Sequence, residues 1–219
     1  MRNMEFSPKP GFQIEVENGY EYFIPQEFQE NPIEYFEREG KNIKTGEIKF
    51  DENRRVLEDP TTVKDLPVWR NNNGKELHVV AKRVNTGKGE MMKSGDPFYE
   101  YKILKLVQEL GLLAAKPVAK VEKGNVHLII MERIFGVRWS EKDSLNLKER
   151  GYSNKDIENL KMQAESKMEQ LKKKFEEAGI IRGWKLKDMV FDVDIENKII
   201  RGIVPTDWER TKIEKQSPN

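Results

Sequence analysis

The sequence predicts an α+β fold, because its strand patterns and helix patterns form separate blocks along the chain. Apolar residues recur every three or four positions in segments 97–110 and 153–178, and this spacing is typical of amphipathic helices. Runs rich in Val and Ile occupy segments 66–84, 116–134 and 189–206, and they predict hairpins. The expected order is therefore a hairpin, a helix, a second hairpin, a long helix and a last hairpin.

The first 60 residues have a weaker pattern than the rest of the chain. Segment 12–25 alternates apolar and polar residues and contains aromatic side chains, so it predicts strands. Segment 32–40 predicts a short helix that ends at Gly40. Segment 45–59 predicts a further strand and a turn.

Local signals place the first hairpin and the helix that follows it. Residues 71–74 read Asn-Asn-Asn-Gly, and both residue types tolerate the positive φ angles that a hairpin turn needs. Asp96 is a suitable N-cap with Pro97 at the first helical position, and Gly111 is a suitable stop. The expected apolar stripe of this helix comprises Ile103, Leu104, Val107 and Leu110.

The long helix is predicted from Ser153 to Ala178. Ser153 and Asp156 have the spacing of a capping box, and Gly179 ends the pattern. The apolar stripe comprises Ile157, Leu160, Ala164, Met168, Leu171, Phe175 and Ala178. This stripe also fits a coiled coil, although about three and a half heptads with one leucine seam make a marginal one. Residues 180–188 after the helix are predicted as a loop.

Composition excludes several kinds of chemistry. The 219-residue chain has no cysteine, so disulfides, thiolate metal sites and a cysteine nucleophile are excluded. His78 and His127 lie far apart in apolar runs, where surface-tipped strand positions explain them better than a catalytic triad or a metal cluster. The net charge of +1 argues against nucleic acid as a general partner.

We expect a cytoplasmic protein without membrane association. No segment is apolar for long enough to cross a bilayer, and residues 1–10 lack the apolar stretch of a signal peptide. Abundant Lys and Glu together with the absence of Cys also favour a thermophilic source.

Four features occur in an order that resembles the protein-kinase-like superfamily. The strand sequence VVAKR carries Lys82, and the next helix carries Glu100 in its first turn. The long helix leads through a loop to Asp188, and the last hairpin ends in Asp207. The sequence DWE at that position is more similar to the aminoglycoside and choline kinase branch. The strand NVHLIIME, which ends at Glu132, resembles the strand that enters the hinge of these proteins.

This resemblance covers about residues 66–212, and it implies a two-lobed protein-kinase-like fold with a reduced C-terminal lobe. The N-terminal, β-rich lobe would span residues 1–135, and the small C-terminal lobe would span residues 136–219. A hinge is expected over residues 132–137.

The same resemblance implies a site for ATP and Mg²⁺ between the lobes. Lys82 would hold the phosphates and pair with Glu100, and backbone groups near Glu132 would meet the adenine. Asp188 and Asp207 would hold Mg²⁺. A lysine and one or two carboxylate-bound Mg²⁺ ions are suitable for this task, because they neutralise the charge that develops during phosphoryl transfer.

The family pattern is incomplete at the catalytic loop, which reads H-R-D-x-x-x-x-N in these proteins. Aligning Asp188 with the asparagine places Gly183 where the catalytic aspartate would stand, and glycine cannot accept a proton. A shifted register makes Asp188 the base and leaves Val193 in the metal position, where Asp192 or Asp194 would have to substitute as the ligand. No G-x-G-x-x-G precedes Lys82. The resemblance therefore implies atypical, weak or absent phosphoryl transfer, as in a pseudokinase.

Each of these residues also has a purely structural interpretation. Lys82 fits a strand lysine whose amino group reaches solvent, and Glu100 fits the acidic first turn of a helix. Asp188 and Asp207 fit turn positions. The tryptophans Trp139, Trp184 and Trp208 fit core anchors.

Two other classes of function stay open. A kinase-derived scaffold that binds no nucleotide would act through a protein partner, in agreement with Gly183 and the missing Gly-rich loop. A nucleic-acid-binding protein would use the lysine run 172–174 and the basic loop 181–187, although the neutral net charge argues against it.

Overall fold

The computed structural model describes residues 13–16, 22–39, 41–42, 63–71, 73–84, 95–138, 147–149, 151–194, 196–208 and 210–214. Both helices and antiparallel sheets are present in these residues, so the α+β prediction is confirmed. The expectations for Gly40, Trp139 and segment 45–59 lie outside the described residues.

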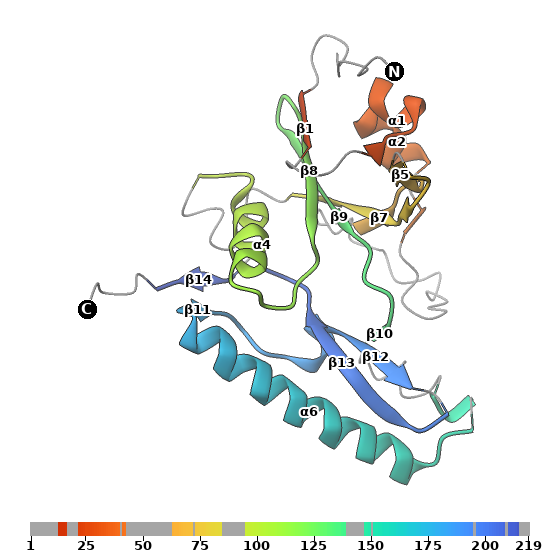
Figure 1. Ribbon diagram of the computed structural model, residues 1–219, viewed down its shortest axis with the longest axis vertical. Helices are drawn as coiled ribbons and strands as arrows, with labels where there is room; N and C mark the ends of the chain where they lie inside the picture. Colours follow the sequence, from red (N-terminus) through yellow and green to blue (C-terminus); the bar gives the residue numbers. More distant parts are fainter. Residues whose placement is uncertain are drawn as a thin grey trace, which may run out of the picture.

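A six-stranded antiparallel sheet forms the upper part of the molecule in Figure 1. In spatial order its strands are β1 (Gln13–Val16), β8 (Pro117–Lys123), β9 (Val126–Glu132), β7 (Val79–Arg83), β4 (Val63–Asp65) and β3 (Lys41–Asn42). The central strand β7 pairs with β4 and β9, which places Lys82 opposite Val63 and Ile129. The prediction of a hairpin from β8 and β9 is confirmed.

One face of this sheet is covered by the N-terminal elements. They are the helices α1 (Gln26–Glu30) and α2 (Pro32–Arg38) and a small sheet of β2 (Tyr22–Phe23), β5 (Trp69–Asn71) and β6 (Glu76–Leu77). Phe28 and Trp69 are completely buried there, with ring centroids 6.0 Å apart. Val79 and Ala81 of β7 belong to the same core cluster. Since side chains alternate along a strand, Val80 and Lys82 face the opposite side of the sheet.

Helix α4 (Tyr99–Glu109) covers that opposite side (Figure 1). The helix begins later than predicted, because the Asp96 carboxylate accepts the Phe98 N–H at 2.9 Å and forms a turn before the first helical residue. The stop at Gly111 is confirmed by its φ of +68°. The prediction for Leu110 was wrong, since this side chain is 46% exposed at the C-cap.

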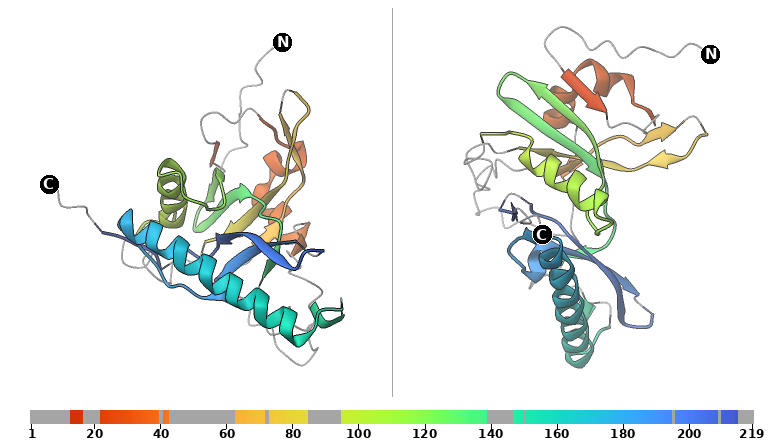
Figure 2. Two further views of the ribbon diagram at one scale, coloured as in Figure 1. Left: turned by 60° about the horizontal axis from the view of Figure 1, so that its bottom comes forward. Right: turned by 60° about the vertical axis from the view of Figure 1, so that its left-hand side comes forward.

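Helix α6 (Asn154–Glu177) begins at the predicted capping box, with hydrogen bonds in both directions between Ser153 and Asp156. It packs against the sheet of β10 (Val137–Arg138), β12 (Met189–Asp194) and β13 (Ile199–Pro205). Its buried stripe comprises Leu160, Ala164, Leu171 and Phe175. The chain's own core therefore uses the stripe, and the coiled-coil alternative was wrong. Figure 2 shows α6 along the outside of the molecule.

The segment after α6 is more ordered than the predicted loop. Strand β11 (Ile180–Ile181) pairs with β14 (Lys212–Ile213), and the short 3-10 helix η1 (Leu186–Asp188) precedes β12. Continuing the β11–β14 register by one residue places Arg182 opposite Thr211. The Tyr99 hydroxyl donates to the Thr211 carbonyl at 3.0 Å, so the start of α4 contacts this region.

The connection from β9 to β10 passes close to β12 at Gly136. A Cβ atom there would lie 2.5 Å from the Phe191 carbonyl oxygen, which only glycine avoids. One hydrophobic cluster includes residues of β7, β9, α4, α6, β12 and β13. The division into two lobes at residues 135 and 136 stays a prediction.

His127 is only 8% exposed, so the surface-tipped interpretation was wrong for this residue. Its Nε2 lies 3.4 Å from Glu122, and its ring packs edge-on against Phe98, which explains why a strand histidine faces inward.

In the part of the chain that the structure describes, no helix is both long and apolar enough to span a bilayer.

Candidate functional site: a buried ion pair beside an arginine and two aspartates

Lys82 of β7 and Glu100 of α4 form a buried ion pair. The Lys82 amino group donates to both carboxylate oxygens of Glu100, at 2.9 and 2.7 Å. Their side chains are 9% and 2% exposed. The expected contact between the two residues is therefore confirmed, and the interpretation of Lys82 as a lysine that reaches solvent was wrong.

The local structure explains how this pair forms. Lys82 points away from the Trp69 side of the sheet, and α4 lies across that face with Glu100 in its first turn. A carboxylate at a helix N-terminus is favoured by the exposed backbone N–H groups. Desolvating two charges nevertheless costs much of what their attraction returns. Stability alone is therefore a weak explanation for a charged pair at this position.

Arg182, which follows β11, is the second buried cation and is only 7% exposed. Its guanidinium carbon lies 4.5 Å from the ring centroid of Trp208 and 5.2 Å from that of Trp184. Phe175 of α6 contacts both tryptophans, with centroid distances of 5.7 and 5.5 Å. Trp184 and Trp208 therefore act as anchors, as predicted, and they also hold a cation in place.

Asp188 and Asp207 lie at adjacent strand ends. Met189 pairs with Pro205, and the Thr206 N–H and hydroxyl both donate to the Asp188 carbonyl, at 2.8 and 2.9 Å. Asp188 is half-buried and Asp207 is exposed. Asp207 has a φ of +32°, a conformation that Asp tolerates better than most residues. These two hydrogen bonds, one from the backbone and one from the side chain of Thr206, thus hold the residue before Asp207 next to Asp188.

Electrostatic interactions connect Arg182 with the predicted site residues. Burial lowers the pKa of Arg182 to about 10, against the opposing attraction of Asp207, Asp188 and Glu100. The arginine stays protonated at neutral pH, and three carboxylates lie within its electrostatic range. Glu100, Asp188 and Asp207 thus act on the same guanidinium, and Lys82 is joined to this group through its ion pair with Glu100.

Sequence reasoning missed Arg182, which it assigned to the basic loop 181–187. The available signal was local, since Arg182 follows two isoleucines and precedes Trp184 by two positions. An arginine in such apolar surroundings is a candidate for burial between aromatic rings.

Glu132 is the predicted site residue that this cluster does not include. It is the last residue of β9 and is half-buried, and its N–H donates to the Lys116 carbonyl at 2.8 Å. The following N–H, of Arg133, donates to the His78 carbonyl at 2.9 Å. These two donors are therefore already used, and a role for this segment in adenine binding stays a prediction.

The two aspartates fit a magnesium site only in part. The described residues contain no group of three or more His, Asp or Glu side chains arranged to hold a metal ion. Mg²⁺ nevertheless keeps several waters and takes as few as one or two protein carboxylates when phosphate oxygens complete its shell. Asp188 and Asp207 would supply those carboxylates.

Comparisons with known proteins give a structural similarity at low sequence identity. No protein-family model matches the chain, and no curated protein matches it. The solved structure of WaaP in complex with acyl carrier protein is similar at 15% sequence identity, over 91% of this chain and 75% of that chain, with a TM-score of 0.47.

Proposed function

We propose that this chain is a kinase-like protein that binds ATP with Mg²⁺ next to the Lys82–Glu100 pair, with atypical, weak or absent phosphoryl transfer. The observation that carries the proposal is the buried ion pair between β7 and α4. A lysine oriented by a buried glutamate presents a fixed positive charge, and such a charge suits the phosphates of a nucleotide.

The neighbouring aspartates support the same proposal. Asp188 and Asp207 would bind the metal ion that accompanies the phosphates, and Arg182 would keep the carboxylates from repelling one another. Bound Mg²⁺ would supply charge neutralisation between the phosphate oxygens. Lys82 would orient the phosphates, and Glu100 would hold the lysine amino group in position.

Gly183 supports the qualification about catalysis. Asp188 directly precedes β12, which favours aligning it with the asparagine of the family's catalytic loop. In this register Gly183 takes the position of the proton acceptor, and it has no side chain to accept a proton. Without a general base, a factor of about 10²–10⁴ in rate is lost even when the nucleotide binds well.

Isothermal titration of the full chain with ATP and Mg²⁺ tests the proposal. We expect binding by the wild type and about tenfold weaker binding after Asp207→Ala or Lys82→Ala, because each removes a charged contact. Glu158→Ala and Lys173→Ala, at exposed positions of α6, are the matched controls. Absence of binding by the wild type, or equal affinities for all five proteins, would contradict the proposal.

A second candidate is a kinase-like scaffold that binds no nucleotide and acts through a protein partner. It is favoured by Gly183 and by the absence of a three-carboxylate metal group among the described residues. A melting temperature that is insensitive to every nucleotide, together with a stable partner in pull-down, would support it. A melting temperature that rises with ATP only when Mg²⁺ is present would count against it.

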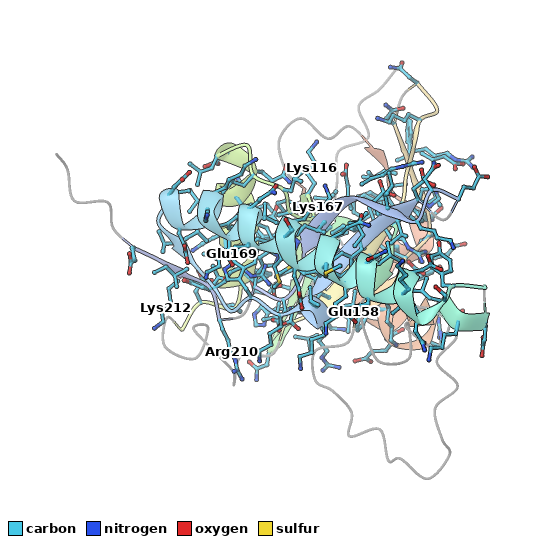
Figure 3. The ribbon with its side chains drawn as sticks, turned by 90° about the horizontal axis from the view of Figure 1, so that it is seen from below. Lys116, Glu158, Lys167, Glu169, Arg210 and Lys212 are labelled. Atoms are coloured by element: carbon cyan, nitrogen blue, oxygen red, sulfur yellow. The ribbon has the colours of Figure 1, made fainter. Side chains whose placement is uncertain are left out.

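Nucleic acid binding finds little support in the geometry of the lysine run. Lys172 lies 3.7 Å from Glu169 and 4.0 Å from Glu176, so acidic side chains flank the run on α6. Figure 3 shows Glu158, Lys167 and Glu169 along the same helix, a mixture of both charges. A nucleic-acid surface would instead need a continuous basic stripe.

A further inference from the structure

The geometry points to Arg182 as a fixed internal cation that restricts divalent-ion binding at Asp188 and Asp207, so that Mg²⁺ enters only together with a phosphate-bearing ligand. This inference rests on the proposed function, and it names the residue that controls the metal requirement. The phosphate could belong to a nucleotide or be free in solution, and the experiment below separates the two sources.

Arg182 is held in place by aromatic side chains and by a hydrogen bond. Its guanidinium stacks against Trp208 and Trp184, which Phe175 supports from α6. Its Nε donates to the Gly183 carbonyl at 3.3 Å. A guanidinium packed between two rings cannot swing into solvent when another cation approaches, unlike a surface arginine.

Within the described part of the chain, the positive charge of Arg182 is not neutralised by a hydrogen-bonded carboxylate. Its Nη1 is buried without a hydrogen-bond partner. Asp207, Asp188 and Glu100 attract the guanidinium through space, but the described residues show no hydrogen bond between it and any of these carboxylates. The guanidinium packs on Trp208, which directly follows Asp207, so its positive charge acts beside Asp207 and Asp188.

The charges of the site residues nearly cancel. Lys82 pairs with Glu100, and Arg182 is attracted by Glu100, Asp188 and Asp207. These two basic and three acidic groups together carry one net negative charge. A free divalent ion would meet this small attraction together with repulsion from an immobile guanidinium. A phosphate adds negative charge and oxygen ligands at once, and two protein carboxylates then suffice.

Mn²⁺ serves as the probe for Mg²⁺, and equilibrium dialysis at matched concentrations of free Mn²⁺ gives the amount bound to the protein, because ATP and pyrophosphate also bind Mn²⁺ in solution. For the wild-type full chain we expect weak binding of Mn²⁺ alone and about tenfold or more tighter binding with ATP present. Sodium pyrophosphate and inorganic phosphate are the other two arms. Enhancement by ATP alone indicates the nucleotide as the phosphate source, and enhancement by pyrophosphate or phosphate indicates free phosphate.

Two substitutions at one position separate charge from packing. Arg182→Gln and Arg182→Lys both lose the planar guanidinium between the rings, but only Arg182→Gln loses the positive charge. We expect Arg182→Gln to bind Mn²⁺ alone about tenfold more tightly than the wild type, and Arg182→Lys to stay within about twofold of it. Asp207→Asn added to Arg182→Gln should remove the gain.

The outcomes are distinct. Equal gains for Arg182→Gln and Arg182→Lys, or no gain for Arg182→Gln, would overturn the inference. If either variant fails to fold, the wild type alone decides, because tight saturable binding of Mn²⁺ without any phosphate would overturn it equally. A gain by Arg182→Gln in a chain that binds no ATP would sink the proposed nucleotide function and leave the metal restriction standing.

Discussion

At the scale of single residues, the Lys82–Glu100 pair differs from a surface ion pair in exposure and not in distance. Arg70 and Glu76 have the same N–O separation of 2.7 Å, but their side chains are 64% and 46% exposed. Water screens that surface pair and would solvate either partner if the other were removed. Glu100, at 2% exposure, has no such access to solvent.

Lys82→Met should therefore destabilise the fold by about 3–5 kcal/mol, because it leaves a buried carboxylate without its counter-charge. The double variant Lys82→Met/Glu100→Gln should recover a substantial part of this loss. Arg70→Met is the control, with an expected cost of at most about 1 kcal/mol. Urea unfolding gives all four free energies, and equal costs for Lys82→Met and Arg70→Met would contradict the prediction.

Gly183 offers a second test at this scale. A Cβ atom built on Gly183 would meet no atom within 4 Å, so a side chain can start there without a clash at its first atom. If Gly183 takes the position of the proton acceptor, Gly183→Asp should raise the rate of ATP hydrolysis about hundredfold or more. Gly183→Asn has the same size and cannot act as a base. Indistinguishable rates for the two variants would argue for the shifted register, in which Asp188 is the base.

At the scale of elements, the start of α6 is connected to the β12–β13 turn by polar contacts. The Asp156 carboxylate accepts from the Lys198 amino group at 2.9 Å and from the Ser153 N–H and hydroxyl at 2.9 and 2.7 Å. The Gln163 side chain accepts the Ile200 N–H at 2.9 Å. The helix is therefore fixed to β13 by hydrogen bonds in addition to its buried stripe.

These contacts predict how stability depends on pH. The hydrogen bonds from Lys198 and Ser153 lower the pKa of Asp156 to about 2. A carboxylate with a lowered folded-state pKa stabilises the protein above its unfolded-state pKa of about 3.9 and loses this effect as the pH falls toward 2. The stability difference between wild type and Asp156→Asn should therefore be full at pH 6 and shrink steadily below pH 4.

Urea unfolding between pH 6 and pH 3 measures this difference. Glu158→Gln is the control, because it removes a negative charge from an exposed position of the same helix (Figure 3). A difference for Asp156→Asn that stays constant over this range would show that the ion pair with Lys198 does not stabilise the fold.

Element length decides how much of this fold is predictable from sequence. Helix α6 follows its predicted span closely, since 24 residues repeat the period several times and carry a cap at each end. Strands β11 and β14 have two residues each, which is too few to show a period in the sequence. They pair only because residues 212–213 come back beside residues 180–181 in the folded chain. The sequence order indicated Lys82, Glu100, Asp188 and Asp207, whereas the burial of Arg182 depends on that unpredictable pairing.

At the scale of the whole molecule, the question is whether the sheet and the C-terminal elements unfold together. The resemblance to the protein-kinase-like superfamily implied two lobes, with a boundary between residues 135 and 136. One hydrophobic cluster nevertheless contains Ile129 of β9, Leu104 of α4 and Phe175 of α6. A shared core of this kind favours cooperative unfolding, because opening either side exposes apolar surface of the other.

Phe175→Ala tests this cooperativity, since Phe175 is fully buried in α6 and supports both Trp184 and Trp208. We expect a loss of about 3–5 kcal/mol in the free energy of unfolding. Amide hydrogen exchange should then accelerate in β7 and β9 as much as in α6, because all three open in one global transition. Met162→Ala, at a 55% exposed position of α6, should leave exchange unchanged in both regions. If Phe175→Ala accelerates exchange only after residue 135, the two parts unfold separately and the lobes are independent units.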